Sequence, residues 1–193
     1  MTLKEKLLNS AKELSNVYAI TALAMLLALR VIVGIFANAT MPLFANTVKI
    51  SINFLPIAVA AALFGPLGAG LVGALGDIVS FFINSAGTTY FPGFTINGFL
   101  TGVILGVFLY KNNITVKSVL ISWTVNAVFI EVLLSGYWLY FIYGTGTADS
   151  FMVFLWARVI SEAIKFIPTV LIILGVGKAT TQIHSSIKGK RAS

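Results

Sequence analysis

The sequence contains no cysteine and only one histidine, His184. The absence of cysteine excludes disulfide bonds, thiolate nucleophiles and cysteine metal sites. Because His184 lies in the polar C-terminal tail, a serine–histidine pair or a histidine-ligated metal within the apolar part of the chain is excluded as well. The acids in that part are single residues without a DxxxD-type pair, which argues against hydrolase or lipid transferase chemistry. We therefore expect no catalytic residues, no metal site and no cofactor.

Charge is also scarce, since 10% of the residues are charged, 58% are hydrophobic and the mean hydropathy is +0.97. Soluble domains average about 25% charged residues, so this chain lacks the charge to cover a water-facing surface. Its long apolar runs are typical of membrane helices and lack the alternation of a membrane barrel. The sequence predicts an all-α integral membrane protein. The net charge of +7 does not indicate nucleic acid, because the basic residues cluster as membrane topology requires.

Six apolar segments predict six transmembrane helices, at about residues 17–37, 49–64, 67–84, 94–110, 118–142 and 151–176. We expect a kink at Pro56 in the second and a tight turn at residues 65–68 before the third. Residues 1–16 have the pattern of an amphipathic helix on the cytoplasmic surface or leading into the membrane, and residues 177–193 form a basic tail. The whole chain, 1–193, is then a single membrane domain.

The basic residues outside these segments gather on one side of the predicted topology. Six spans place both termini on that side, and Lys49 lies near the opposite face. By the positive-inside rule both termini are cytoplasmic. A signal peptide with a cleavage site near Ala39 is the alternative for the first segment, but the apolar run is longer than an h-region and Arg30 interrupts it.

An uncharged loop rich in aromatic residues connects the third and fourth segments and therefore faces outward. The stretch 76–97 begins beside Asp77 and contains the sequence YFPGF at residues 90–94. Proline fixes the backbone and glycine permits a sharp reversal, so together they would hold an aromatic wall at the outer membrane face. Aromatic clusters at this depth are often interface belts, which is the alternative. We interpret the loop as the rim of an outward-facing ligand pocket.

Ionisable residues within the predicted spans are expected to pair or to bind something, because each costs about 2.5–3.5 kcal/mol at a helix centre on insertion scales. Glu162 has the spacing of an ion pair with either Arg158 or Lys165 on one helix face. Four bases against three acids leave one positive charge, which favours an anionic ligand. These seven residues are Arg30, Lys49, Asp77, Glu131, Arg158, Glu162 and Lys165. With the nearby aromatic residues, they predict a flat, polar, negatively charged nutrient.

Small residues account for the motifs that resemble nucleotide sites. The GxGxxG pattern at residues 68–73 has no βαβ context, and Gly98, Gly102 and Gly106 share one helix face, so both sets indicate close helix packing. Ala24 and Ala28 lie one turn apart in the first span, and either pack internally or form a lipid-facing docking stripe. Since the chain has no nucleotide-binding motif, ATP-driven transport would need another subunit.

Several stretches resemble the substrate-binding S-components of energy-coupling factor (ECF) vitamin transporters. They are KISINFLPIA at 49–58, LFGP at 63–66, GALGD at 73–77, YFPGFT at 90–95 and LTG at 100–102. The resemblance is dense from about residue 49 to 110 and thin afterwards. YFPGFT makes the chain most similar to the folate-specific S-components.

The resemblance implies a vitamin-binding protein of the bacterial plasma membrane that hydrolyses nothing itself. Such proteins associate with a membrane coupling protein and two ATPase subunits, and are thought to topple in the bilayer to deliver their ligand. The small-residue stripe of the first helix, here Ala24 and Ala28, typically meets the coupling protein. Other vitamins such as riboflavin, and a stand-alone ion-coupled secondary transporter, are the alternatives.

Folate fits the inventory of charges and rings, since it has a flat pterin ring and a tail with two carboxylates. We expect the pterin to stack among aromatic residues, an acid or amide to read its edge, and basic residues to bind the tail or polar ring atoms. The candidates are Tyr90, Phe91, Phe94 and Trp138 for the aromatic wall, Asn97 and Glu131 for the edge, and Arg30, Lys49 and Arg158 for the negative charge.

Overall fold

The computed structural model describes the backbone of residues 2–40, 42–43, 48–49, 52–84, 89–112, 114–144 and 151–190. Side chains are described for these residues except 36–40, 42–43, 48–49, 143–144, 154 and 179–190. Lys49 belongs to the excepted group, so its side chain lies outside the described part of the chain.

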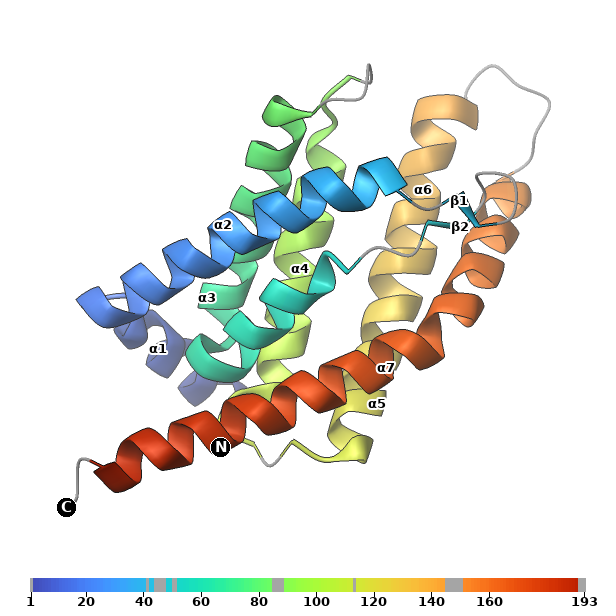
Figure 1. Ribbon diagram of the computed structural model, residues 1–193. Helices are drawn as coiled ribbons and strands as arrows, with labels where there is room; N and C mark the ends of the chain where they lie inside the picture. Colours follow the sequence, from blue (N-terminus) through green and yellow to red (C-terminus); the bar gives the residue numbers. More distant parts are fainter. Residues whose placement is uncertain are drawn as a thin grey trace.

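Helices make up nearly all of the described chain (Figure 1). In order they are α1 Leu3–Glu13, α2 Val17–Thr40, α3 Phe54–Ile83, α4 Pro92–Leu109, α5 Val116–Asn126, η1 Ala127–Leu134, α6 Ser135–Leu139, η2 Tyr140–Gly144 and α7 Phe151–Lys190. The segments η1 and η2 are π-helical, and they continue α5 and α6 as one long rod. Two short antiparallel strands, β1 Pro42–Leu43 and β2 Val48–Lys49, lie between α2 and α3.

Five helical segments among the described residues are long and apolar enough to cross a membrane. They are Val17–Ile35, Phe54–Ile83, Pro92–Leu109, Val116–Ile142 and Phe151–Lys178. The second is broken at Gly65, whose backbone has φ 80° and ψ −168°, a conformation that side chains disfavour. In Figure 1 the first half of α3 runs toward the end where α1 lies, and the second half runs back from it. The expected turn at residues 65–68 is therefore present, and the all-α membrane fold is confirmed.

The predicted kink at Pro56 is wrong. Helix α3 begins at Phe54, so Pro56 lies in its first turn, where a proline removes no helical hydrogen bond. Pro92 acts in the same way as the first residue of α4, with Phe91 as the capping residue. Prolines expected to bend a span and to shape a loop therefore mark the starts of two helices.

Helices α3 and α4 pack closely because glycines face one another across their contact. A Cβ on Gly73 would lie 2.1 Å from the carbonyl oxygen of Gly98, and one on Gly102 would lie 2.3 Å from that of Ala69. Any larger side chain would separate the two helices. The glycines at 98, 102 and 106 thus serve packing, as the sequence predicted.

The core lies where α2, α3, α4, α5 and α7 meet, and it includes the buried residues Ala60, Leu105, Val119 and Ile173. Helix α1 and the C-terminal end of α7 lie at the same end of the molecule (Figure 1), as an even number of spans requires. The backbone of α7 stays helical to Lys190, beyond the expected end of the span at residue 176.

Candidate ligand-binding site

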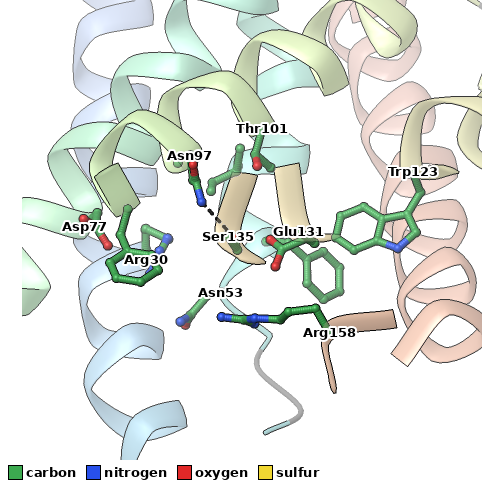
Figure 2. Close-up of a pocket in the computed structure, with 13 residues that line it drawn as sticks. Arg30, Asn53, Asp77, Asn97, Thr101, Trp123, Glu131, Ser135 and Arg158 are labelled. Atoms are coloured by element: carbon green, nitrogen blue, oxygen red, sulfur yellow. Dashed lines mark hydrogen bonds between the residues drawn. The ribbon is translucent and has the colours of Figure 1, made fainter. Parts of the chain in front are cut away.

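A cavity of about 200 Å³ opens among α2, α3, α4, α5, η1, α6 and α7 (Figure 2). It is remote from α1, since its walls include the two ends of α3 and the first half of α4, whereas α1 contacts the middle of α3 and the last turn of α4. Its lining combines charged, amide and aromatic side chains. The lining residues are Arg30, Asn53, Phe54, Ile57, Asp77, Phe94, Asn97, Gly98, Thr101, Trp123, Glu131, Ser135 and Arg158. A concave apolar site with a few convergent polar groups is the usual form of a small-molecule pocket.

Arg30 crosses from α2 into this cavity over two glycines. A Cβ on Gly76 would lie 2.5 Å from Arg30 Cγ, and one on Gly34 would lie 3.1 Å from an Arg30 terminal nitrogen. Asp77 is the acid that interacts electrostatically with Arg30 (Figure 2). The Arg30 side chain is buried, and its Nε has no hydrogen-bond partner among the described residues. The absence of side chains at two glycines thus gives a buried guanidinium access to the pocket.

Asp77 is held by a short chain of hydroxyl groups. Thr95 Oγ1 donates to Asp77 Oδ2 at 2.7 Å, and the Tyr90 hydroxyl lies 2.7 Å from the same Thr95 oxygen. Because the single Thr95 proton goes to the carboxylate, the Tyr90 hydroxyl is the donor in the second bond. The aromatic loop is therefore connected to the pocket through this hydroxyl chain.

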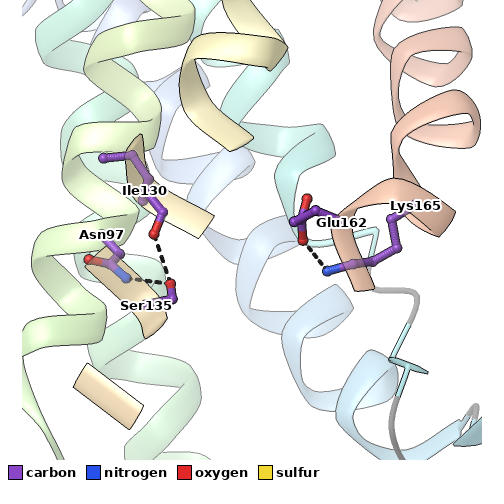
Figure 3. Close-up of polar contacts among 5 residues, drawn as sticks. All are labelled: Asn97, Ile130, Ser135, Glu162 and Lys165. Atoms are coloured by element: carbon purple, nitrogen blue, oxygen red, sulfur yellow. Dashed lines mark hydrogen bonds and ion pairs between the residues drawn. The ribbon is translucent and has the colours of Figure 1, made fainter. Parts of the chain in front are cut away.

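Asn97 belongs to a second network, which joins α4 to the π-helical rod. Its Nδ2 donates to Ser135 Oγ at 2.8 Å, and its Oδ1 accepts from Trp138 Nε1 at 3.1 Å. Ser135 Oγ in turn donates to the carbonyl oxygen of Ile130 at 3.0 Å, five residues earlier (Figure 3). Both ends of the Asn97 amide are thus engaged within the protein, at a place where π-helices leave irregular backbone.

Charges on the opposite side of the cavity come from η1 and α7. Glu131 interacts electrostatically with Glu162, Lys165 and Arg158. Glu162 forms its ion pair with Lys165, one of the two bases that the spacing allowed (Figure 3). Arg158 lines the cavity, whereas Lys165 is paired with Glu162, so the two bases of α7 have different surroundings.

Apart from Lys117 and Lys178 at the ends of two spans, the described ionisable side chains within the spans balance in charge, three against three. The bases are Arg30, Arg158 and Lys165, and the acids are Asp77, Glu131 and Glu162. The unmatched positive charge predicted from the sequence is therefore Lys49, which belongs to β2.

Aromatic rings line the cavity in a different set from the one expected. Phe94 lines it as predicted, together with Phe54 and Trp123, whose ring centroids are 5.4 Å apart. Sequence reasoning missed Phe54 and Trp123, although Phe54 lies within the stretch 49–58 that carries the family resemblance. Trp123 Nε1 is buried and has no hydrogen-bond partner among the described residues.

The other expected aromatics pack on one another beside the cavity. Tyr90 contacts Phe81 and Phe82, with centroid distances of 5.2 and 6.0 Å. The ring centroids of Phe91 and Trp138 are 5.3 Å apart, and the Trp138 ring covers the backbone at Gly93. Stacking of a ligand on Tyr90, Phe91 or Trp138 stays a prediction. The structure brings together five of the nine expected ligand-binding residues: Arg30, Phe94, Asn97, Glu131 and Arg158.

The expected docking residues lie on the surface of α2. Ala24 and Ala28 are both exposed, which contradicts the internal-packing alternative. Ala24 lines an apolar groove of about 350 Å³ between α2 and α3, whose other walls include Leu14, Gly68 and Leu71. No group of three or more potential metal ligands occurs among the residues that the structure describes.

Comparison with known proteins decides the family. Residues 18–177 match the family described as "ECF transporter, substrate-specific component". The chain belongs to this family. As an S-component it is a multi-pass protein of the bacterial plasma membrane, in agreement with its candidate spans.

Two curated relatives of this S-component are transporters. The folate transporter FolT of Clostridium novyi (strain NT) is 31% identical over 162 residues, which are 84% of this chain and 89% of the relative. FolT of Leuconostoc mesenteroides is 29% identical over 152 residues, 75% of this chain and 76% of the relative. A crystal structure of FolT bound with folic acid matches the fold with a TM-score of 0.72 and 32% identity, and the match covers 85% of this chain and 95% of the other.

Proposed function

We propose that this S-component binds folate at its outer face. The observation that carries the proposal is a buried donor of a pocket residue, Arg30 Nε, which has no acceptor among the described residues. Buried N–H groups are nearly always paired, so this donor calls for a ligand with acceptor atoms. Fused heterocycles and carboxylates both supply such atoms.

The aromatic lining favours a flat ring as the part of folate that enters deepest. Phe54, Phe94 and Trp123 line a cavity of about 200 Å³. Pockets for whole drug-sized ligands measure about 300–1,000 Å³, so this cavity suits the pterin ring alone. The remainder of the ligand then extends outward, and Lys49, whose side chain lies outside the described part of the chain, is our candidate base for the glutamate carboxylates.

Each side of the cavity carries one base and one acid, which supports a ligand ring that has both hydrogen-bond donors and acceptors. Arg30 and Asp77 lie on one side, and Glu131 and Arg158 on the other. A pterin has adjacent donors and acceptors along its edges, which a carboxylate and a guanidinium recognise in pairs. The relatives named for folate transport support the same ligand.

Mass spectrometry of small molecules released from the purified protein tests this proposal. Folate or a reduced folate is the expected species, and calorimetry should give saturable folate binding to ligand-free protein. Release of riboflavin, thiamine, pantothenate or biotin, with no calorimetric response to folate, would assign the pocket to another vitamin.

ATP-driven delivery of folate would require partners, because the chain has no nucleotide-binding motif. We infer that a membrane coupling protein and two ATPases supply the energy, and that the coupling protein docks at Ala24 and Ala28. The exposure of both alanines on α2 and the groove beside Ala24 support this surface. Close approach of helices needs small residues at such places.

Bulky substitutions test the docking surface. Ala24→Trp and Ala28→Trp should abolish folate uptake in cells and leave folate binding by the isolated protein intact. Uptake that persists when the ATPases are deleted would indicate a stand-alone secondary transporter instead.

A further inference from the structure

A single hydroxyl group, that of Ser10 in α1, holds both ends of the break in α3. Ser10 Oγ donates to the carbonyl oxygen of Phe64 at 2.7 Å. The same oxygen accepts from the backbone N–H groups of Leu67 at 3.0 Å and Gly68 at 3.4 Å. The first bond satisfies the end of one half-helix, and the other two satisfy the start of the next. Ser10 is completely buried, so water does not substitute for it.

The space around this hydroxyl is filled. A Cβ on Gly65 would lie 3.0 Å from Ser10 Cβ and Oγ and 3.1 Å from Tyr110 Cδ1. The left-handed conformation of Gly65 and the position of Ser10 therefore depend on each other. The geometry of the reversal is set by the contact between α1 and α3.

The apolar groove beside Ala24 starts at this reversal. Gly68, which donates to Ser10, is also a lining residue of the groove, and Leu14 at the end of α1 forms another part of its wall. A Cβ on Gly68 would lie 3.3 Å from Leu23 Cδ2 of α2, so the two helices approach closely here. A shift of the first turn after the break would change the width of the groove.

Other contacts attach α1 independently of Ser10. Lys6 Nζ donates to the carbonyl oxygen of Val107 at 2.6 Å, near the end of α4. The Tyr110 hydroxyl donates to Glu13 Oε1 at 3.5 Å. Burial lowers the pKa of Lys6 because its ammonium loses water, yet it satisfies a terminal carbonyl of α4. Removing the Ser10 hydroxyl should therefore leave α1 in place.

We propose that Ser10 is a positioning residue for the partner-docking groove, holding the Gly65 reversal in the shape that the coupling protein recognises. The inference rests on the proposed function, since it assumes docking at Ala24 and Ala28. Helix α1 thereby acts on subunit assembly from the end of the molecule opposite to the ligand pocket.

Co-purification tests this role. The S-component, or a variant of it, is co-expressed with the coupling protein and the two ATPases of its own organism, and the fraction recovered on a tagged coupling protein is measured. Folate affinity by calorimetry and the thermal midpoint are measured on the isolated protein. Ser10→Ala should reduce recovery at least about fivefold, which corresponds to a loss of roughly 1 kcal/mol in binding to the coupling protein. The folate Kd should stay within about twofold of the original.

Matched variants separate this role from a general loss of stability. Ser15 is exposed in the turn after α1, and Ser15→Ala should leave recovery and midpoint unchanged. Lys6→Met removes an anchor of α1 but not the bonds at the break, so it should lower the midpoint and retain assembly. Full recovery of Ser10→Ala, or parallel loss of folate binding and assembly in it, would overturn the inference.

The docking surface itself is tested in the same series. Loss of recovery in Ala24→Trp together with normal recovery in Ser10→Ala would refute the role of Ser10 alone. Normal recovery of both Ala24→Trp and Ala28→Trp would refute the docking surface, and the Ser10 inference with it, without affecting the folate measurement.

Discussion

Thr95 Oγ1 donates a 2.7 Å hydrogen bond to Asp77 Oδ2, across the contact between α4 and α3. The Tyr90 hydroxyl completes the chain from the aromatic loop, also at 2.7 Å. Asp77 in turn interacts electrostatically with Arg30. The loop thus influences the pocket by orienting one carboxylate and, through it, one guanidinium.

Removal of the Thr95 hydroxyl should weaken folate binding. A hydrogen bond to a charged group contributes about 1.5–3 kcal/mol, and Asp77 would turn toward Arg30 once the bond is lost. We expect Thr95→Val to raise the folate Kd about tenfold by calorimetry. Thr95→Ser keeps the hydroxyl and should bind within about twofold of the original protein. Equal affinities of the valine and serine variants would contradict a role for this bond.

Arg158 and Lys165 provide a direct comparison of two bases on one helix. Arg158 lines the cavity, whereas Lys165 is paired with Glu162. Arg158→Ala should raise the folate Kd at least about tenfold because a planar, charged donor is lost, and Arg158→Lys should recover only part of this affinity. The exposed Lys117 at the start of α5 offers a control, since Lys117→Ala removes the same charge far from the cavity. Unchanged affinity in Arg158→Ala would exclude Arg158 from the site.

Breaking the ion pair of Glu162 and Lys165 should lower the thermal stability of the protein. Glu162 is 5% exposed, so Lys165→Met leaves a buried carboxylate without its base, close to Glu131. Breaking one partner of a buried pair costs about 3–5 kcal/mol, which should lower the thermal midpoint of the purified protein clearly.

The double variant Glu162→Gln, Lys165→Met tests the cause of that loss. It removes both charges, and its midpoint should recover most of the difference. A double variant as unstable as Lys165→Met would show that packing of the lysine stem, and not its charge, is responsible.

Local signals in the sequence predicted the membrane segments and the reversal at residues 65–68, because apolar length and a Gly-Pro pair act within one stretch of chain. The role of Pro56 was mistaken since the start of α3 was placed five residues early, at residue 49. The π-helical segments η1 and η2 have no comparable sequence signal. The rod that contains them is joined to α4 by the contact of Ser135 with Asn97, two residues that are distant in the chain.

The sequence predicted the charged residues that line the cavity better than the aromatic ones. Arg30, Glu131 and Arg158 were found because an ionisable residue inside a membrane is rare and needs a reason. Aromatic residues have no such cost in an apolar chain, so Trp123 and Phe54 could not be distinguished from lipid-facing residues. Tyr90 was conspicuous in its loop, yet its ring packs on Phe82 and its hydroxyl serves Asp77 through Thr95.

Gly76 offers a way to move Arg30 without changing its chemistry. A Cβ at this position would lie 2.5 Å from Arg30 Cγ, too close for the guanidinium to keep its place. We therefore expect Gly76→Ala to raise the folate Kd about tenfold by calorimetry. Gly175 in α7 is the matched control, because a Cβ there meets nothing within 4 Å. Since alanine is favoured over glycine inside helices by about 0.5–1 kcal/mol, Gly175→Ala should preserve affinity and raise the thermal midpoint slightly.

A double-mutant cycle between Gly76 and Arg30 then decides whether the effect passes through the arginine. If the added methyl group acts by displacing the guanidinium, Gly76→Ala should have almost no further effect on affinity in an Arg30→Ala background. Additive losses in the double variant would mean that Gly76 shapes the cavity directly, for example through the neighbouring Asp77. The expected non-additivity is thus specific to the arrangement in which the missing side chain at Gly76 of α3 lets Arg30 of α2 enter the cavity.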